Sequence, residues 1–164
     1  MLVLGIDPGT AITGYGLVRE QPDGALEAVA YGVVRTSART PMPDRLRQIH
    51  HDITALIAEY RPDAAAIETL YFGRNVTTAI TVAQGRGVIL LALAEAGLPI
   101  REYKPAEIKQ AIAGYGNAEK EQVQEMIRQL LDLDAVPQPD DAADGLGVAI
   151  TDLNASRFER LISE

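Results

Sequence analysis

The chain has 164 residues, enough for one domain with a full core, and its composition (47% apolar, 23% charged) is that of an ordinary soluble globular protein. The absence of cysteine excludes disulfides and thiolate metal sites, and the only two histidines are adjacent, so any bound cation would be held by oxygen. The net charge of −8 argues against nucleic acid at face value, but residues 132–164 hold eight acids and two bases, and the rest is nearly neutral.

The N-terminus has no basic region or cleavage site of a secretory signal, and no apolar run approaches the ~20 residues of a membrane span. We therefore expect a cytoplasmic protein with no membrane partner.

Five strands are predicted. The opening apolar run is typical of a strand buried on both faces, and Pro8-Gly9 ends it. A hairpin signal, Asp23-Gly24, separates the next two strands, so three antiparallel strands open the chain. An alanine-rich fourth segment is ambiguous with helix, but its shortness favours a buried parallel strand. The predicted strands are residues 2–6, 13–18, 26–34, 64–68 and 99–103.

Apolar residues at helical spacing predict five helices. Inside the second helix lie Gly85 and Gly87, which each cost about 1 kcal/mol relative to alanine. Close packing of another backbone would explain them, either the protein's own sheet or a twin helix across a two-fold axis. The predicted helices are residues 44–60, 75–95, 105–113, 119–131 and 140–160.

This order of elements predicts a single α/β domain over residues 1–164. A five-stranded mixed sheet with the first strand in the centre and helices on both faces is its natural packing.

Acids occupy three element ends beside the predicted core. Asp7 closes the first strand and Glu68 the fourth, and neighbouring parallel strands would bring both to one sheet edge. Asp141 and Asp144, three residues apart on the last helix, face the same way. Each acid alone has an ordinary explanation, as a turn cap, a solvated strand end or a helix N-terminal charge. Together they could hold two divalent cations, which activate water for phosphoryl displacement.

Motifs along nearly the whole chain carry a family resemblance. They are Gly-Ile-Asp-Pro-Gly-Thr at 5–10, Thr-Gly-Tyr-Gly at 13–16, Ala-Ile-Glu at 66–68, Ala-Gln-Gly-Arg-Gly at 83–87, Ala-Glu-Lys at 118–120, Asp-Ala-Ala-Asp at 141–144 and Ala-Ile-Thr at 149–151. This collinear set resembles the RuvC family of Holliday-junction resolvases, which have the ribonuclease-H-like fold.

The resemblance implies a homodimeric endonuclease of recombination and repair that nicks two opposed strands of a four-way DNA junction. It implies Mg²⁺ or Mn²⁺, two per active site, and work beside a RuvA–RuvB branch-migration complex. The implied metal ligands are Asp7, Glu68, Asp141 and Asp144, with Lys109 and Lys120 as catalytic helpers. Asp140 makes the acidic cluster ambiguous by one residue, and spacing favours Asp141 as the ligand.

DNA contacts are also implied by the resemblance. A junction base would stack on Tyr71, where the family commonly has Phe, with Phe72 as a rival. Both aromatics could equally fill the core, and the lysines would ordinarily be solvated helix residues. The expected DNA-contacting residues are Tyr71, Phe72, Arg74, Lys104, Lys109 and Lys120.

Three alternative functions remain open. An actin-like nucleotide-binding protein opens with a similar strand and turn but needs a second similar lobe, which this chain lacks. A YqgF-type ribosomal-RNA-processing nuclease would share the fold, although the Ala-Glu-Lys and Asp-Ala-Ala-Asp blocks favour the resolvase. A catalytically dead junction-binding scaffold would not need all four acids.

Overall fold

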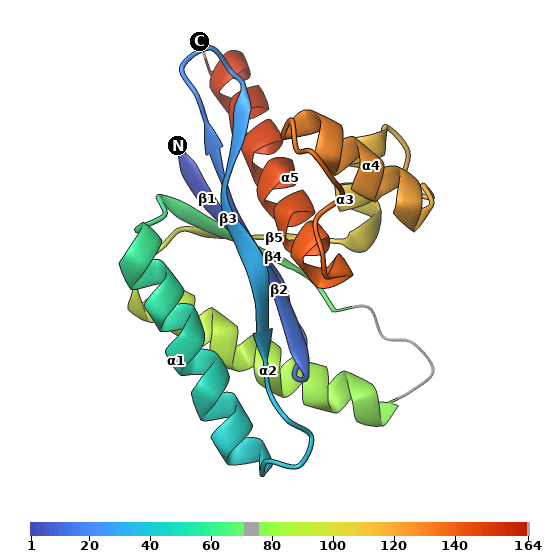
Figure 1. Ribbon diagram of the computed structural model, residues 1–164. Coiled ribbons are helices and arrows are strands. Elements are labelled where there is room, and N and C mark those ends of the chain that lie inside the picture. Colours follow the sequence, from blue (N-terminus) through green and yellow to red (C-terminus); the bar gives the residue numbers. More distant parts are fainter. Residues whose placement is uncertain (71–75, 164) are drawn as a thin grey trace.

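The computed structural model describes residues 1–70 and 76–163 and contains the predicted five-stranded mixed sheet. The strand order is β3-β2-β1-β4-β5, which places β1 in the centre as expected (Figure 1). The strands are β1 (Leu2–Asp7), β2 (Ile12–Glu20), β3 (Leu26–Arg35), β4 (Ala64–Glu68) and β5 (Ile100–Tyr103).

The pairing of β1 decides where its terminal acid lies. β1 runs antiparallel to β2, with Asp7 opposite Gly14, and parallel to β4, with Ile6 opposite Ile67. Parallel neighbours end at the same edge of a sheet, so Asp7 and Glu68 emerge side by side.

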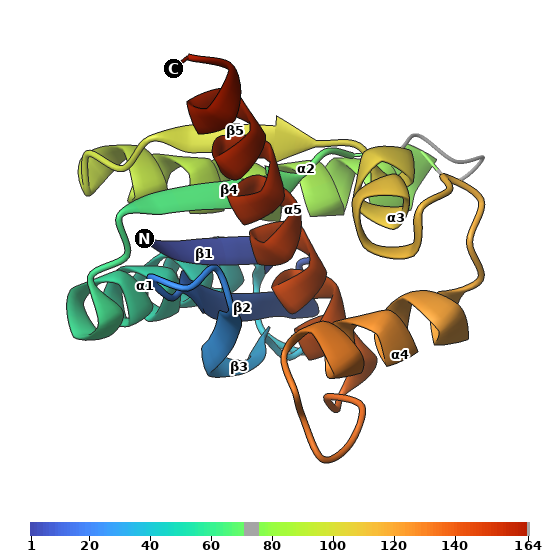
Figure 2. The same cartoon turned by 90° about the horizontal axis from the view of Figure 1, so that it is seen from above.

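Helices cover both faces of the sheet. One face is covered by α1 and α2, and α5 crosses the other face with α3 and α4 beside it (Figures 1 and 2). Side chains of β1 alternate between two cores: Leu4 and Ile6 pack with α1 and α2, whereas Val3 packs with α3, α4 and α5. The helices are α1 (Met42–Tyr60), α2 (Val76–Glu95), α3 (Pro105–Ala113), α4 (Lys120–Leu130) and α5 (Asp140–Ile162).

Local details explain where elements begin. The alanine run of β4 is a strand. Ala64, Ala65 and Ala66 are buried between the two helical layers, where small side chains fill the available space. The first helix begins at Met42, two residues before the predicted start, since Pro43 is tolerated in the first turn.

The start of α5 lies unusually close to the sheet. A Cβ atom on Gly14 would lie 1.8 Å from the carbonyl oxygen of Asp141, and one on Gly145 would lie 2.6 Å from the backbone of Tyr15. Only glycine permits this approach. The small-residue face of α5 therefore packs backbone to backbone, which holds the first turn of the helix against the ends of β1 and β2.

α2 corrects one sequence expectation. Val76–Glu95 is long and apolar enough to cross a membrane by length and composition, with a mean hydropathy of 1.5 in its most apolar window. The expectation that no segment approaches this length was wrong, because only Arg86 and the terminal Glu95 interrupt the helix with charge. A single such helix is weak support for a membrane span, since core helices of soluble proteins pass the same test.

Candidate active site

Asp7 and Glu68 form the floor of the candidate site. Burial, the nearby Glu68 carboxylate and a hydrogen bond between the two side chains raise the pKa of Asp7 from 3.8 to about 9, with smaller contributions from Asp144 and Asp141. Burial also raises the pKa of Glu68, despite the hydrogen bond with Asp7 and the attraction of Lys109. A hydrogen bond between two carboxyl groups requires a proton on one of them, so the protein alone does not favour both groups in the charged form.

The first turn of α5 supplies two more acids. Asp7, Asp141 and Asp144 each offer a carboxylate oxygen, and these three atoms lie within 4.8 Å of one another. Glu68 adjoins the trio through its hydrogen bond to Asp7. Burial is the main cause of the raised pKa of Asp144. The four acids named from the sequence therefore converge at one edge of the sheet.

Asp140 faces a different partner. Its Oδ2 lies 3.2 Å from the Nζ of Lys120, and half of its side chain is exposed. This ion pair lowers the pKa of Asp140. The geometry thus separates the two adjacent acids: Asp141 joins the carboxylate trio, and Asp140 binds the lysine beside it.

Two lysines line the cavity in front of the acids. This cavity has a volume of about 350 Å³ and is bounded by Asp7, Glu68 and Asp144, with Lys109 from α3 and Lys120 from α4. Lys120 lies 3.7 Å from Asp144 Oδ2, and Lys109 stabilises the charged form of Glu68. Both helices thus bring an ammonium group to a site that would otherwise repel a phosphodiester.

Sequence reasoning missed several contributors to the site. Arg86 Nε lies 3.5 Å from the backbone oxygen of Glu68, while Arg86 pairs with Glu102 at 2.7 Å. Its place in the Gln-Gly-Arg-Gly motif was the available signal. The apolar wall has no chemical signature in the sequence, and it consists of Pro105, Ile108, Val123 and Ile127.

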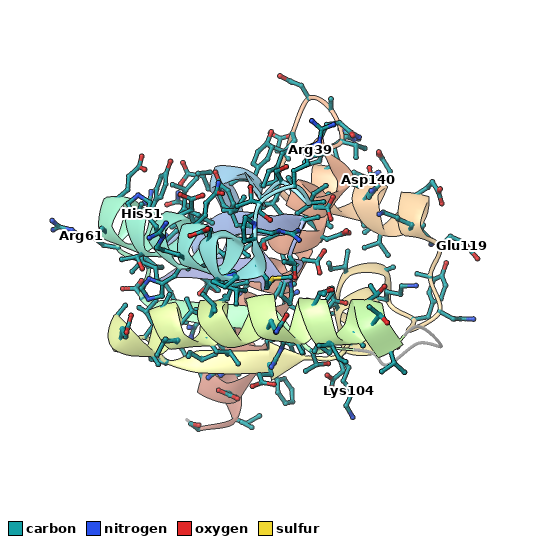
Figure 3. The ribbon with its side chains drawn as sticks, turned by 90° about the horizontal axis from the view of Figure 1, so that it is seen from below. Arg39, His51, Arg61, Lys104, Glu119 and Asp140 are labelled. Atoms are coloured by element: carbon teal, nitrogen blue, oxygen red, sulfur yellow. The ribbon has the colours of Figure 1, made fainter. Side chains whose placement is uncertain are left out.

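The expected DNA contacts are only partly visible. Tyr71, Phe72 and Arg74 lie outside the described residues. Lys104 precedes α3, and its backbone N–H donates to Glu107 at 2.6 Å. It lines a second cavity of about 640 Å³ with Lys109, and its side chain points outward in Figure 3.

Fold and site together define a class: a ribonuclease-H-like domain with a carboxylate cluster where its two central parallel strands end. Within that class, the family model for crossover junction endodeoxyribonuclease RuvC matches residues 3–152. The chain belongs to the RuvC family.

Relatives and solved structures agree with this assignment. The chain is 60% identical over 150 residues to a crossover junction endodeoxyribonuclease RuvC of Heliobacterium modesticaldum, covering 92% of each chain. A Thermus thermophilus RuvC structure superimposes with a TM-score of 0.90 at 37% identity, covering 97% of each chain. Another, of T. thermophilus RuvC in complex with a Holliday junction substrate, gives 0.88 at 34% identity over 96% of each chain.

Proposed function

We propose that this chain is a cytoplasmic, divalent-metal-dependent endonuclease that resolves four-way DNA junctions in recombination and repair. The single observation that carries the proposal is the meeting of Asp7, Asp141 and Asp144, with Glu68 hydrogen-bonded to Asp7, in front of two lysines. Membership of the RuvC family, with a relative solved on a Holliday junction substrate, supports the choice of DNA junctions.

The donor set fits hard divalent cations. Four carboxylates offer only oxygen, which Mg²⁺ and Mn²⁺ prefer. Burial and the neighbouring Glu68 raise the pKa of Asp7, and a bound cation would favour the charged form against both effects. Asp7, Glu68, Asp141 and Asp144 would hold the ions, and we assign two of them to each site. When bound, such a pair supplies an activated water and neutralises charge on the leaving oxygen.

The remaining groups act on the DNA. Water attacks phosphorus, the P–O3′ bond breaks, and the products are a 5′-phosphate and a 3′-hydroxyl that takes up a proton. The ammonium groups of Lys109 and Lys120 lie where the phosphate would enter, so they offset the negative charge that grows on its oxygens. The short pairing of Lys120 with Asp140 keeps its ammonium beside Asp144. We assign base stacking to Tyr71 or Phe72 and backbone contacts to Arg74 and Lys104.

A homodimer suits a substrate with two equivalent cuts. The exposed face of α2 supports this assembly, because Ile80 and Leu91 are 56% and 52% exposed and lie on one side of the helix. Gly87 lies between them, and no atom of the part of the chain that the structure describes lies within 4 Å of the position of its Cβ. The α2 helix of a second copy could approach closely there. Such an interface would bury the exposed apolar residues of α2 and so explain why this helix is apolar without spanning a membrane. We further propose that the dimer works beside a RuvA–RuvB complex.

The other functions are less well supported. An actin-like nucleotide-binding protein would need a second lobe, whereas the RuvC relatives match the chain over nearly their full length. A YqgF-type RNA nuclease would share the fold but not the family match over residues 3–152.

Substrate selectivity tests the proposal. The purified protein is incubated with Mg²⁺ and a synthetic four-way junction, a linear duplex of the same sequence, or a structured RNA. We expect symmetric nicks in opposed strands of the junction and at least tenfold slower cleavage of the others. Preferential cleavage of RNA would support the YqgF-type alternative and reject the resolvase.

A further inference from the structure

A basic segment lies just beyond the carboxylate edge and has no part in the chemistry above. Residues 35–47 contain four arginines and a single acid, in a chain of net charge −8. The acid, Asp44, pairs with Arg47 at 2.9 Å, so it leaves the other three unopposed. Among the described residues, no carboxylate lies within ion-pairing distance of Arg35, Arg39 or Arg45. A surface of this charge is complementary to a polyanion.

Arg45 is fixed in this segment by its Nε atom. Arg45 Nε donates to Thr36 Oγ1 at 2.9 Å, and Thr36 Oγ1 donates in turn to the backbone oxygen of Thr10 at 2.5 Å. Thr36 and Thr10 are both buried. The hydroxyl of Thr36 thus has its acceptor and donor roles filled. Within residues 1–70 and 76–163, neither terminal NH₂ group of Arg45 has a hydrogen-bond or ion-pair partner, so both can bind a ligand.

The anchor of Arg45 is the turn that leaves the active site. Thr10 follows Asp7 by three residues, and its hydroxyl donates to the backbone oxygen of Thr81 on α2. Gly85 lets α2 approach this turn, since a Cβ there would lie 3.2 Å from Thr10 Oγ1. Arg45 is therefore held in a fixed relation to the strand end that carries Asp7.

A cavity opens in front of the arginine. Its volume is about 340 Å³, and it lies between the turn at residues 9–12, Arg45, and residues 78–82 of α2. An arginine whose Nε is already bound presents a planar pair of donors, which matches two oxygens of a phosphate.

We infer that Arg45 binds a backbone phosphate of the DNA substrate, one that lies beside the scissile phosphate rather than at it. The inference rests on the proposed function and deepens it by naming a positioning residue outside the carboxylate site. Arg35 and Arg39 are exposed along the same segment and add positive charge to it. This local positive surface would offset the acidic net charge of the chain where DNA approaches.

Binding of a labelled four-way junction in EDTA, where no cleavage occurs, tests the inference across a range of salt concentrations. Arg45→Gln should weaken binding about tenfold, and it should lower the slope of log K against log [salt] by about 0.9. Arg45→Lys should keep that slope yet lose part of the affinity, because it keeps the charge and loses the anchored fork.

Arg61→Gln is the matched control. Arg61 ends the helix whose first turns carry Arg45, about 24 Å away by the rise of a helix, and it points away from the molecule in Figure 3. This variant should bind as wild type does. Equal affinity and slope for Arg45→Gln and wild type would overturn the inference while leaving junction cleavage intact. Failure of the wild-type protein to bind the junction would reject the proposed function and, with it, the inference.

Discussion

Asp7 is the described carboxyl group whose pKa is raised furthest, to about 9. A group that holds its proton more tightly in the folded state stabilises the fold below its unfolded pKa of 3.8, and this contribution is lost as the pH rises towards 9. The raised pKa values of Glu68 and Asp144 act in the same direction.

The melting temperature in EDTA should therefore respond to Asp7→Asn in a pH-dependent way. We expect the variant to gain stability over wild type by several degrees as the pH rises through this range, because the amide carries no charge to bury. Added Mg²⁺ should stabilise wild type more than the variant. Parallel curves of melting temperature against pH for the two proteins would show that the surroundings of Asp7 do not disfavour its ionisation.

At the same scale, the sequence predicted which acids meet, and the family resemblance implied Lys109 and Lys120 beside them, but the hydrogen-bond and ion-pair partners of the basic side chains could not be predicted. Asp7 and Glu68 could be assigned to strand ends because an apolar run followed by a turn predicts where a strand ends. The pairing of Lys120 with Asp140 and the bond from Arg45 to Thr36 depend on side-chain rotamers, which no local sequence pattern encodes. Arg86 could be noticed in its motif, but its contact with Glu68 could not.

Among the elements, α5 decides whether the site exists at all. Its first turn carries Asp141 and Asp144, and the contact of Asp141 with Gly14 fixes the distance from helix to sheet. Glycines and small residues are visible in the sequences of α5 and β2. The identity of the partner backbone could be known only from the fold.

Gly14→Ala tests this dependence. Its Cβ would lie 1.8 Å from the Asp141 backbone oxygen, so helix and sheet must separate. We expect a loss of about 3 kcal/mol in the free energy of unfolding, as for an overpacked core. Because Asp141 moves with the helix, the stabilisation by Mg²⁺ should also shrink. Denaturant titration with and without Mg²⁺ measures both effects, and wild-type values for both would place α5 differently from the structure.

Element order and sheet topology were predicted correctly because helix and strand periods are distinct along most of this chain. The fourth strand was the difficult case, and its position between a helix and a turn outweighed the low β-propensity of alanine. The start of α1 was misplaced by two residues because prolines at 41 and 43 resemble a loop until the first turn is seen.

For the whole molecule, the proposed dimer interface lies on α2. The exposed face of α2 that carries Ile80 and Leu91 contains Gln84 and Gly87 but no charged residue between the two apolar side chains. Leu91→Glu should place a charge in the proposed dimer interface and convert the protein to a monomer.

Sedimentation at micromolar concentration measures this change. Wild type should sediment as a dimer, and Leu91→Glu near the chain mass of 17.6 kDa. Phe158→Glu is the matched control, because Phe158 is 64% exposed at the far end of α5 and should leave the dimer intact. A wild-type monomer, or a Leu91→Glu dimer, would contradict the proposed interface.

Junction cleavage should depend on the acids of the carboxylate cluster and not on neighbouring acids outside it. Asp140 and Asp141 are adjacent in sequence yet differ in surroundings, so they provide an internal comparison. The most direct measurement is the rate of paired nicking of a four-way junction in Mg²⁺ by wild type, Asp141→Asn and Asp140→Asn. We predict that Asp141→Asn binds the junction but loses at least a hundredfold in rate, whereas Asp140→Asn stays within about tenfold of wild type. Nicking by Asp141→Asn at the wild-type rate would contradict the account.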